Sequence, residues 1–170
     1  MNSHLQKFDH YSLFPLDEWR WPNFSPLEMA CRGSGALMVD FDAMDCLQAL
    51  RDDLGKPIYL NSAYRSPEHN RRVGGAEQSQ HLRARAYDIN LRNHDPRQLE
   101  AAAQKAGFSS FGTYPKQNFL HIDTREQPAR WGEPFPAAPP QEAQATRQPK
   151  ASRPSLPRSR RDRWGRIRSR

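Results

Sequence analysis

The sequence predicts an α+β domain in which a small antiparallel sheet is flanked by helices, followed by a disordered tail. Segments in which apolar and polar residues alternate with a period of two, as in strands, are interspersed with segments that begin at capping residues and end at glycine, as helices do. Residues 1–131 contain 16 Lys and Arg against 16 Asp and Glu, whereas residues 132–170 contain 10 against 3, so the net charge of +7 lies in the tail. The tail also holds seven of the fifteen prolines and few aliphatic side chains, which is typical of disorder. We divide the chain into an irregular N-terminal arm (1–23), a folded domain (24–131) and the tail (132–170).

Helix signals open the folded domain. Ser25, Pro26 and Glu28 provide an N-cap, a proline at the first helical position and a capping-box acid before the sequence LEMACR. A second helix is expected from about Phe41 to Leu54, and Gly55 ends it. The following segment, PIYLNSAYR, is predicted to be the first strand of the domain.

The second half of the domain alternates helices and strands. Ser66 and Pro67 begin a short helix that two glycines end, and a loop follows it. The strand ARAYDINL comes next, after which Asp95 and Pro96 begin the helix RQLEAAAQKA, which ends at Gly107. SSFGTY and NFLHIDT then form the last pair of strands.

Two imidazoles and a carboxylate in this half are candidate metal ligands: His81, Asp88 and His121. The period of two turns Asp88 to the polar side of its strand, and it places His121 and Asp123 on one face of theirs. Catalytic zinc usually takes three protein ligands and keeps a fourth position open for water. The three residues therefore predict a site for one zinc ion per chain, although a single His is more often a hydrogen-bonded core or surface group.

The stretch SAYRSPEHNRRVGGAEQSQHLRARAYDIN, followed by FLHIDTR, resembles the zinc peptidases of the D-Ala-D-Ala carboxypeptidase and murein endopeptidase superfamily, peptidase family M15. It is most similar to the small branch often encoded by phages and gene transfer agents. The resemblance runs from about residue 24 to residue 125, and the family pattern falls on Ser79, His81, Ala86, Asp88 and His121. It implies a hedgehog/D-Ala-D-Ala-peptidase-like fold, zinc on the two histidines and the aspartate, and cell-wall peptides as substrate.

The chain departs from the family pattern in two places. Ala84 stands where the family usually has Gly, so we expect the backbone there to keep a negative φ. Asn118 and Phe119 stand where many members have a catalytic Glu or His, and neither can act as a base. We therefore predict that Asp123 is the general base, because its i+2 relation to His121 aims it into the same cavity. The alternative is that Asp123 orients a ligand histidine.

Arg65, in the segment NSAYRS, is the other predicted catalytic residue. A guanidinium can hold a carboxylate bidentately or stabilise an oxyanion, and the resemblance implies that this one binds substrate. The alternative is an Arg paired with a surface carboxylate. Ser79 and Gln80 precede the first ligand and are expected to contact it or the substrate, although Ser79 equally fits a turn residue.

The function predicted from the sequence is a zinc-dependent peptidase that hydrolyses peptide bonds in bacterial peptidoglycan and is associated with a phage or gene transfer agent. Carboxypeptidase and endopeptidase activity both remain open. One alternative is a catalytically inactive zinc-binding module that serves as a wall-binding or virion structural protein. Another is a nucleic-acid-binding protein driven by the tail, and the charge balance of the domain argues against it.

The two ends of the chain carry further expectations. Seven arginines between Arg158 and Arg170 suit anionic lipid, lipopolysaccharide, wall polymers or nucleic acid, unless the tail is only a solvated extension. The N-terminal segment has neither a signal-peptide pattern nor a transmembrane stretch. We therefore expect a protein made in the cytoplasm that reaches the wall through a holin lesion or on a virion. Cys31 and Cys46 give no disulfide framework and are expected to be core thiols.

Overall fold

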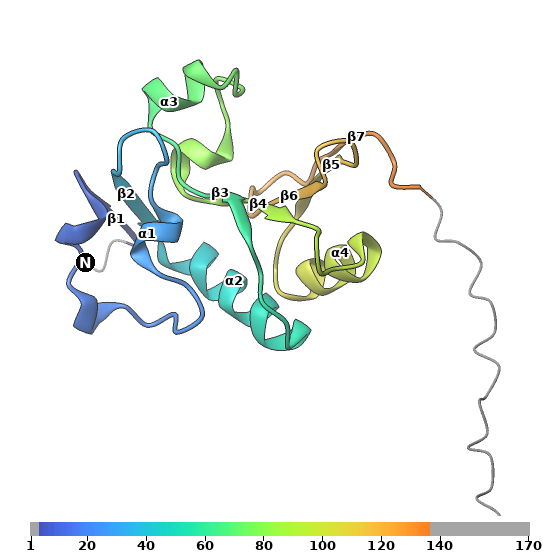
Figure 1. Ribbon diagram of the computed structural model, residues 1–170, viewed down its shortest axis with the longest axis horizontal. Coiled ribbons are helices and arrows are strands. Elements are labelled where there is room, and N and C mark those ends of the chain that lie inside the picture. Colours follow the sequence, from blue (N-terminus) through green and yellow to red (C-terminus); the bar gives the residue numbers. More distant parts are fainter. Residues whose placement is uncertain (1–3, 137–170) are drawn as a thin grey trace, which may run out of the picture. The chain divides into compact units, whose positions relative to one another are not determined.

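Two sheets organise residues 4–136, the part of the chain that the computed structural model describes (Figure 1). The smaller sheet is an antiparallel pair, β1 (Leu5–Phe8) with β2 (Leu37–Asp40). The larger sheet has five strands in the order β3-β4-β6-β5-β7. The tail that we predicted to be disordered lies outside the described residues, apart from its first few positions.

The larger sheet carries the α+β fold that the sequence predicted. Its strands are β3 (Leu60–Ser62), β4 (Ala86–Asn90), β5 (Ser110–Tyr114), β6 (Phe119–Asp123) and β7 (Arg130–Gly132). The β3–β4, β4–β6 and β5–β6 pairs are antiparallel, as expected, whereas β7 runs parallel to β5. The sheet is therefore mixed, and the sequence analysis missed β1, β2 and β7, which are only three or four residues long.

Within residues 4–136, four α-helices accompany the sheets: α1 (Pro26–Met29), α2 (Phe41–Leu54), α3 (Pro67–Arg72) and α4 (Pro96–Lys105). The capping signals locate them well. Ser25 and Glu28 form the predicted capping box of α1, and Gly55 ends α2 with a φ of 60°. Among the described residues no helix is long and apolar enough to cross a membrane.

The described part of the chain also contains three short 3-10 helices: η1 (Tyr11–Leu13), η2 (Leu16–Glu18) and η3 (Gln80–Arg83). The last of these replaces the open loop that we predicted around residues 79–81. Ser79 caps η3, because its hydroxyl accepts a hydrogen bond from the backbone N–H of His81 at 3.3 Å. The turn that carries the first candidate ligand is therefore a defined helical turn.

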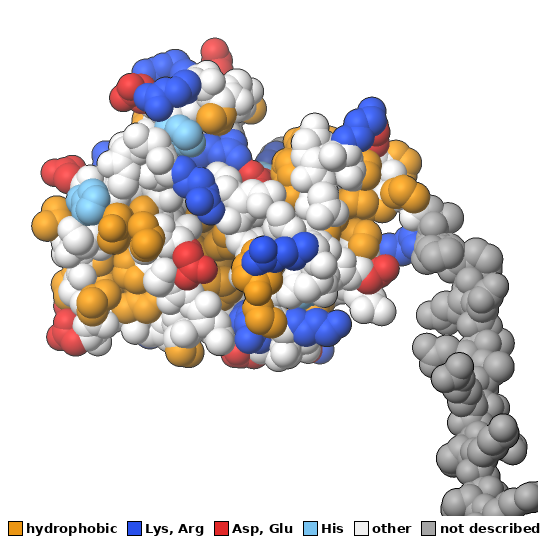
Figure 2. Space-filling model, viewed as in Figure 1, with side chains coloured by type: hydrophobic (Ala, Val, Ile, Leu, Met, Phe, Trp, Pro, Cys, Tyr) orange, Lys and Arg blue, Asp and Glu red, His pale blue; other side chains and the backbone are white. Residues whose placement is uncertain are grey.

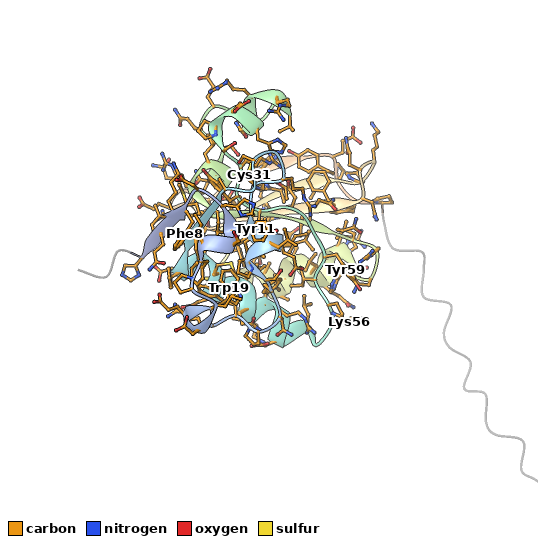
Figure 3. All side chains as sticks on the ribbon, turned by 60° about the vertical axis from the view of Figure 1, so that its left-hand side comes forward. Phe8, Tyr11, Trp19, Cys31, Lys56 and Tyr59 are labelled. Carbon is orange, nitrogen blue, oxygen red and sulfur yellow. The ribbon has the colours of Figure 1, made fainter. Side chains whose placement is uncertain are left out.

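The N-terminal arm, which we separated from the domain at residue 23, contributes side chains to the same hydrophobic core. Trp21 is 1% exposed, and its indole N–H donates to Asp45 of α2 at 2.7 Å. Trp19 packs edge to face against both Phe14 and Trp21. Figure 3 labels Trp19 together with Phe8 and Tyr11, two other aromatic residues of the arm. The arm is regular in part and fills the space beside α2, whose inner face needs apolar cover.

Candidate metal centre

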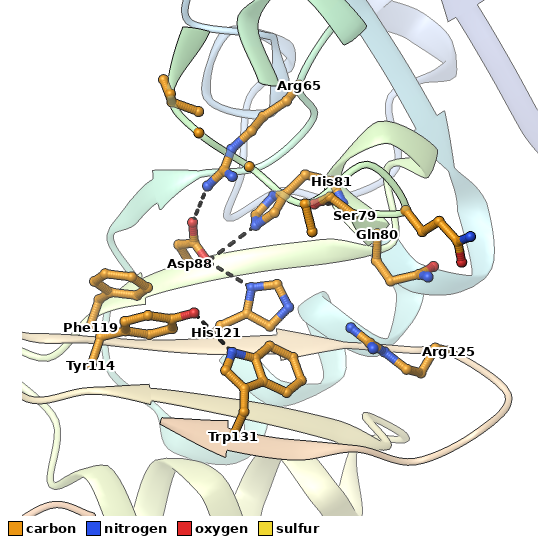
Figure 4. A pocket seen from close by; sticks show the side chains of 15 residues that line it. Arg65, Ser79, Gln80, His81, Asp88, Tyr114, Phe119, His121, Arg125 and Trp131 are labelled. Carbon is orange, nitrogen blue, oxygen red and sulfur yellow. Dashed lines mark hydrogen bonds and ion pairs between the residues drawn. The ribbon is translucent and has the colours of Figure 1, made fainter. Parts of the chain in front are cut away.

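The register of β4 against β6 creates the candidate site. Asp88 lies directly opposite His121, and η3 supplies His81 from the neighbouring turn. One atom of each of these three residues lies within 4.8 Å of the other two, and all three side chains are buried. Sequence reasoning thus identified three residues, from positions up to forty apart, that the fold brings together (Figure 4).

The histidine rings are held with one nitrogen each toward Asp88. Nδ1 of His81 lies 2.6 Å from the carbonyl oxygen of Ala63, which can only accept, so this nitrogen carries the proton. Nε2 of His81 is then unprotonated and faces Oδ1 of Asp88 at 3.2 Å. The backbone carbonyl just after β3 therefore selects the tautomer that a metal ligand requires.

His121 is held in the opposite sense. Its Nδ1 faces Oδ1 of Asp88 at 2.8 Å, and its Nε2 donates to Oδ2 of Asp123 at 3.0 Å. Nε2 of His81, Oδ1 of Asp88 and Nδ1 of His121 therefore point toward one common space. Two imidazole nitrogens and a carboxylate oxygen are a donor set that suits zinc, so the residues present fit this ion.

The electrostatics of the cluster favour a cation. Burial would raise the pKa of Asp88, but hydrogen bonds from His121 and His81 outweigh burial and hold that pKa well below its usual range. Burial lowers the pKa of His81, which keeps this ring neutral. Burial also acts to lower the pKa of His121, but the two carboxylates beside it raise the pKa overall. A positive charge is thus stabilised between Asp88 and Asp123.

Asp123, the predicted general base, lies beside His121 but outside the cavity. Its side chain is fully buried, and it is not among the residues that line the cavity beside the cluster. Both of its oxygens accept hydrogen bonds from Arg125, and one also accepts from His121. Its pKa lies well below the usual carboxyl range, because these bonds outweigh the effect of burial. This geometry favours the alternative interpretation, a carboxylate that orients His121, over the general base.

The other predicted site residues line a cavity of about 530 Å³ that opens beside the cluster. Arg65 is 17% exposed at its side chain; it forms an ion pair with Oδ2 of Asp88, and its Nε donates to Ser62. It is thus paired with a buried candidate ligand rather than with a surface carboxylate. Ser79 and Gln80 lie on the wall that η3 forms (Figure 4).

Tyr114, Arg125 and Trp131 are among the residues of this cavity that the sequence did not lead us to expect. The ring of Trp131 lies 5.1 Å from that of His121, and its indole N–H donates to the hydroxyl of Tyr114 at 2.8 Å. Gly112 makes this possible, since a Cβ there would come within 2.5 Å of the Trp131 ring. A glycine inside a strand pattern often signals such a close approach, and it was the available clue.

Ala84 departs from our expectation. Its φ is 55°, so it adopts the left-handed conformation instead of the negative φ that we predicted for a residue with a Cβ. The methyl group is buried with Cys31 and Tyr64 in a small second cluster. Cys31 is a buried free thiol, as expected, whereas Cys46 is only half-buried.

Comparison with known proteins gives a family and a set of relatives. A family model described as Peptidase M15 matches residues 22–123. Peptidoglycan L,D-endopeptidase MepK of Escherichia coli strain K12 is 34% identical over an alignment of 93 residues, and the match covers 51% of this chain and 51% of that protein. The protein of the same name from Shigella flexneri matches equally. The chain spans about half the length of the curated relatives it matches.

Proposed function

This chain belongs to the M15 peptidase family, and on that premise we propose that it is a zinc-dependent peptidase that hydrolyses peptide bonds in bacterial peptidoglycan. The observation that carries the proposal is the convergence of Nε2 of His81, Oδ1 of Asp88 and Nδ1 of His121 at the edge of an open cavity. The relatives are named peptidoglycan endopeptidases, which supports the substrate class and an endopeptidase over a carboxypeptidase.

We propose one zinc ion per chain. Two neutral imidazoles and one carboxylate leave a fourth position of a tetrahedral site open, as catalytic sites require. When bound, zinc supplies Lewis-acid chemistry at a carbonyl oxygen and lowers the pKa of a coordinated water.

The residues around the cluster have positioning and binding roles in this proposal. Arg65 holds Oδ2 of Asp88 and turns Oδ1 toward the histidines. It also remains our candidate for binding a substrate carboxylate or a developing oxyanion, because its Nη1 has no partner among the described residues. Asp123 fixes the ring of His121. Ser79 caps the turn that carries His81, while Gln80 faces the cavity and is proposed to contact the peptide.

One observation favours the inactive zinc-binding module as the second candidate. Among the described residues that line the cavity, Asp88 is the sole carboxylate, and it faces the histidines. The described lining of the cavity thus offers no second acid that could take a proton from water. The nucleic-acid-binding alternative gains no support, since basic and acidic side chains are interspersed on the face shown in Figure 2.

Several expectations stay predictions. The anionic envelope polymers or nucleic acids expected to bind the basic tail concern residues outside the described range. Association with a phage or gene transfer agent, and delivery through a holin lesion or on a virion, rest on the sequence resemblance alone.

The proposal is tested by incubating the full chain with purified sacculi and analysing the released muropeptides by mass spectrometry. The active peptidase releases products whose masses identify one cleaved peptide bond, and the His81→Ala variant releases none. If the chain is instead the inactive module, the unaltered protein binds zinc, and neither it nor the His81→Ala variant releases muropeptides from the sacculi.

A further inference from the structure

Arg125 stands at the end of β6, on the wall of the cavity that also contains the candidate metal centre. Its side chain is 29% exposed, whereas its partner Asp123 is fully buried. Figure 4 shows the guanidinium beside the rings of His121 and Trp131, on a different side of the cluster from Arg65. The cavity is thus bordered by two arginines, with the three candidate ligands between them.

Only one edge of the Arg125 guanidinium is used within the described protein. Nε donates to Oδ1 of Asp123 at 2.8 Å, and Nη2 donates to Oδ2 at 2.5 Å, so these two nitrogens form one fork on one carboxylate. Nη1 and the second N–H of Nη2 form the other edge, for which the described residues provide no acceptor. An arginine has five N–H donors in a planar arrangement, and its two edges can bind two carboxylates in the same plane.

The free edge is also held in place. The fork on Asp123 fixes the guanidinium plane, and its central carbon lies 5.0 Å from the centre of the Trp131 ring. A donor pair that is oriented before the ligand arrives loses little side-chain entropy on binding. Such a guanidinium prefers a planar anion with two oxygens, which a carboxylate provides.

We propose that Arg125 is a specificity residue that binds a free carboxylate of the substrate peptide through Nη1 and Nη2. This inference rests on the proposed function for the identity of the substrate. The carboxylate lies on the Trp131 side of the metal centre, and Arg65 remains available for a second polar group of the peptide. Arg125 thereby lets the site distinguish wall peptides whose side-chain or α-carboxylates are free from those in which these groups are amidated.

The test uses one wall stem peptide in two forms that differ only in having free or amidated carboxylates. The zinc-loaded full chain is assayed for kcat/KM and, by calorimetry, for binding of both forms. Hydrogen bonds to charged groups discriminate by roughly tenfold or more. We therefore expect the unaltered protein to prefer the free form by about that factor in both measurements.

Arg125→Lys should lose most of this preference, measured as the ratio of kcat/KM and of affinity between the two peptides, because lysine keeps a charge beside Asp123 but has no second planar edge. Arg83→Gln, an exposed change of charge outside the cavity, should keep the full preference and so controls for long-range electrostatics. Zinc content and thermal unfolding of each variant exclude loss of the metal or of the fold as the cause.

Two outcomes overturn the inference: equal use of both peptides by the unaltered protein, or an unchanged preference in Arg125→Lys. Failure of the proposed function looks different. If neither peptide is cleaved, the binding measurements by calorimetry still test the carboxylate subsite. Tighter binding of the free form, lost in Arg125→Lys, would support the subsite even though the protein is not a peptidase. Equal binding of both forms contradicts the subsite.

Discussion

Asp123→Asn separates the two roles that a carboxylate beside His121 can have. The substitution keeps the size of the side chain and removes its charge. Asparagine can still accept the hydrogen bond from Nε2 of His121 through its amide oxygen, but it cannot hold both nitrogens of the Arg125 fork as a carboxylate does. The orientation of His121 is therefore weakened rather than lost.

The structure sets the expected magnitudes. Breaking a fully buried ion pair costs about 3–5 kcal/mol, and the partial exposure of Arg125 lets water compensate, so we expect a loss of about 2 kcal/mol in the free energy of unfolding. Loss of a carboxylate that orients a ligand histidine typically weakens metal binding by about 10–100-fold, and the retained hydrogen bond favours the lower end. Turnover at saturating zinc should fall much less than the roughly 10²–10⁴-fold expected on loss of a general base.

Zinc affinity is measured by competition with a chelating dye, stability by urea unfolding, and turnover as a function of added zinc. Asp53→Asn is the matched control, because Asp53 pairs with Lys105 at the surface and the same change there should cost under about 1 kcal/mol. Unchanged zinc affinity together with a hundredfold loss of turnover at saturating zinc would refute the orienting role and restore Asp123 as the base.

Three further predictions follow from the packing around the site. His81→Ala should lose zinc by elemental analysis while keeping its far-ultraviolet circular dichroism, because the ring is a proposed ligand and its backbone turn is capped independently. Ala84→Gly should change the unfolding free energy by less than about 1 kcal/mol, because two effects oppose each other. Glycine relieves a left-handed backbone conformation that costs alanine about 1–2 kcal/mol, but it also removes a buried methyl group that contributes about 0.8 kcal/mol. Ala103→Gly, at a buried helical position without that relief, should cost about 2 kcal/mol by the same measurement. Gly112→Ala should destabilise the folded protein by about 1–3 kcal/mol and shift the fluorescence of Trp131, because the added methyl group meets the indole ring. An unchanged emission spectrum and melting temperature would show that the ring is free to move.

Local rules predicted the helices and the long strands because their signals lie within a few residues of one another. The capping box at Ser25 and the glycine stop at Gly55 are such signals, and both are present in the structure. β7 could not be found this way. Its pairing with β5 joins positions about twenty residues apart, and neither its length nor its composition distinguishes it from a loop.

In the candidate site, too, the local pattern predicted some features and could not predict others. The period of two in NFLHIDT correctly placed His121 and Asp123 near each other, and the structure joins them by a hydrogen bond. What the pattern could not show is Arg125, which covers the outer side of Asp123 and closes it off from the cavity. Arg125 is only two residues from Asp123, but whether its guanidinium turns onto that carboxylate depends on the backbone and side-chain conformation after the end of β6, which strand periodicity does not encode.

The dependence of peptidoglycan digestion on zinc tests the account most directly. The full chain, freed of metal by a chelator, is titrated with zinc while the release of soluble muropeptides from sacculi is recorded. A metal centre of three protein ligands predicts no release without zinc and saturation at about one equivalent per chain, with no response in the His81→Ala variant. Equal digestion by the chelator-treated protein, or saturation that survives the loss of His81, would contradict it.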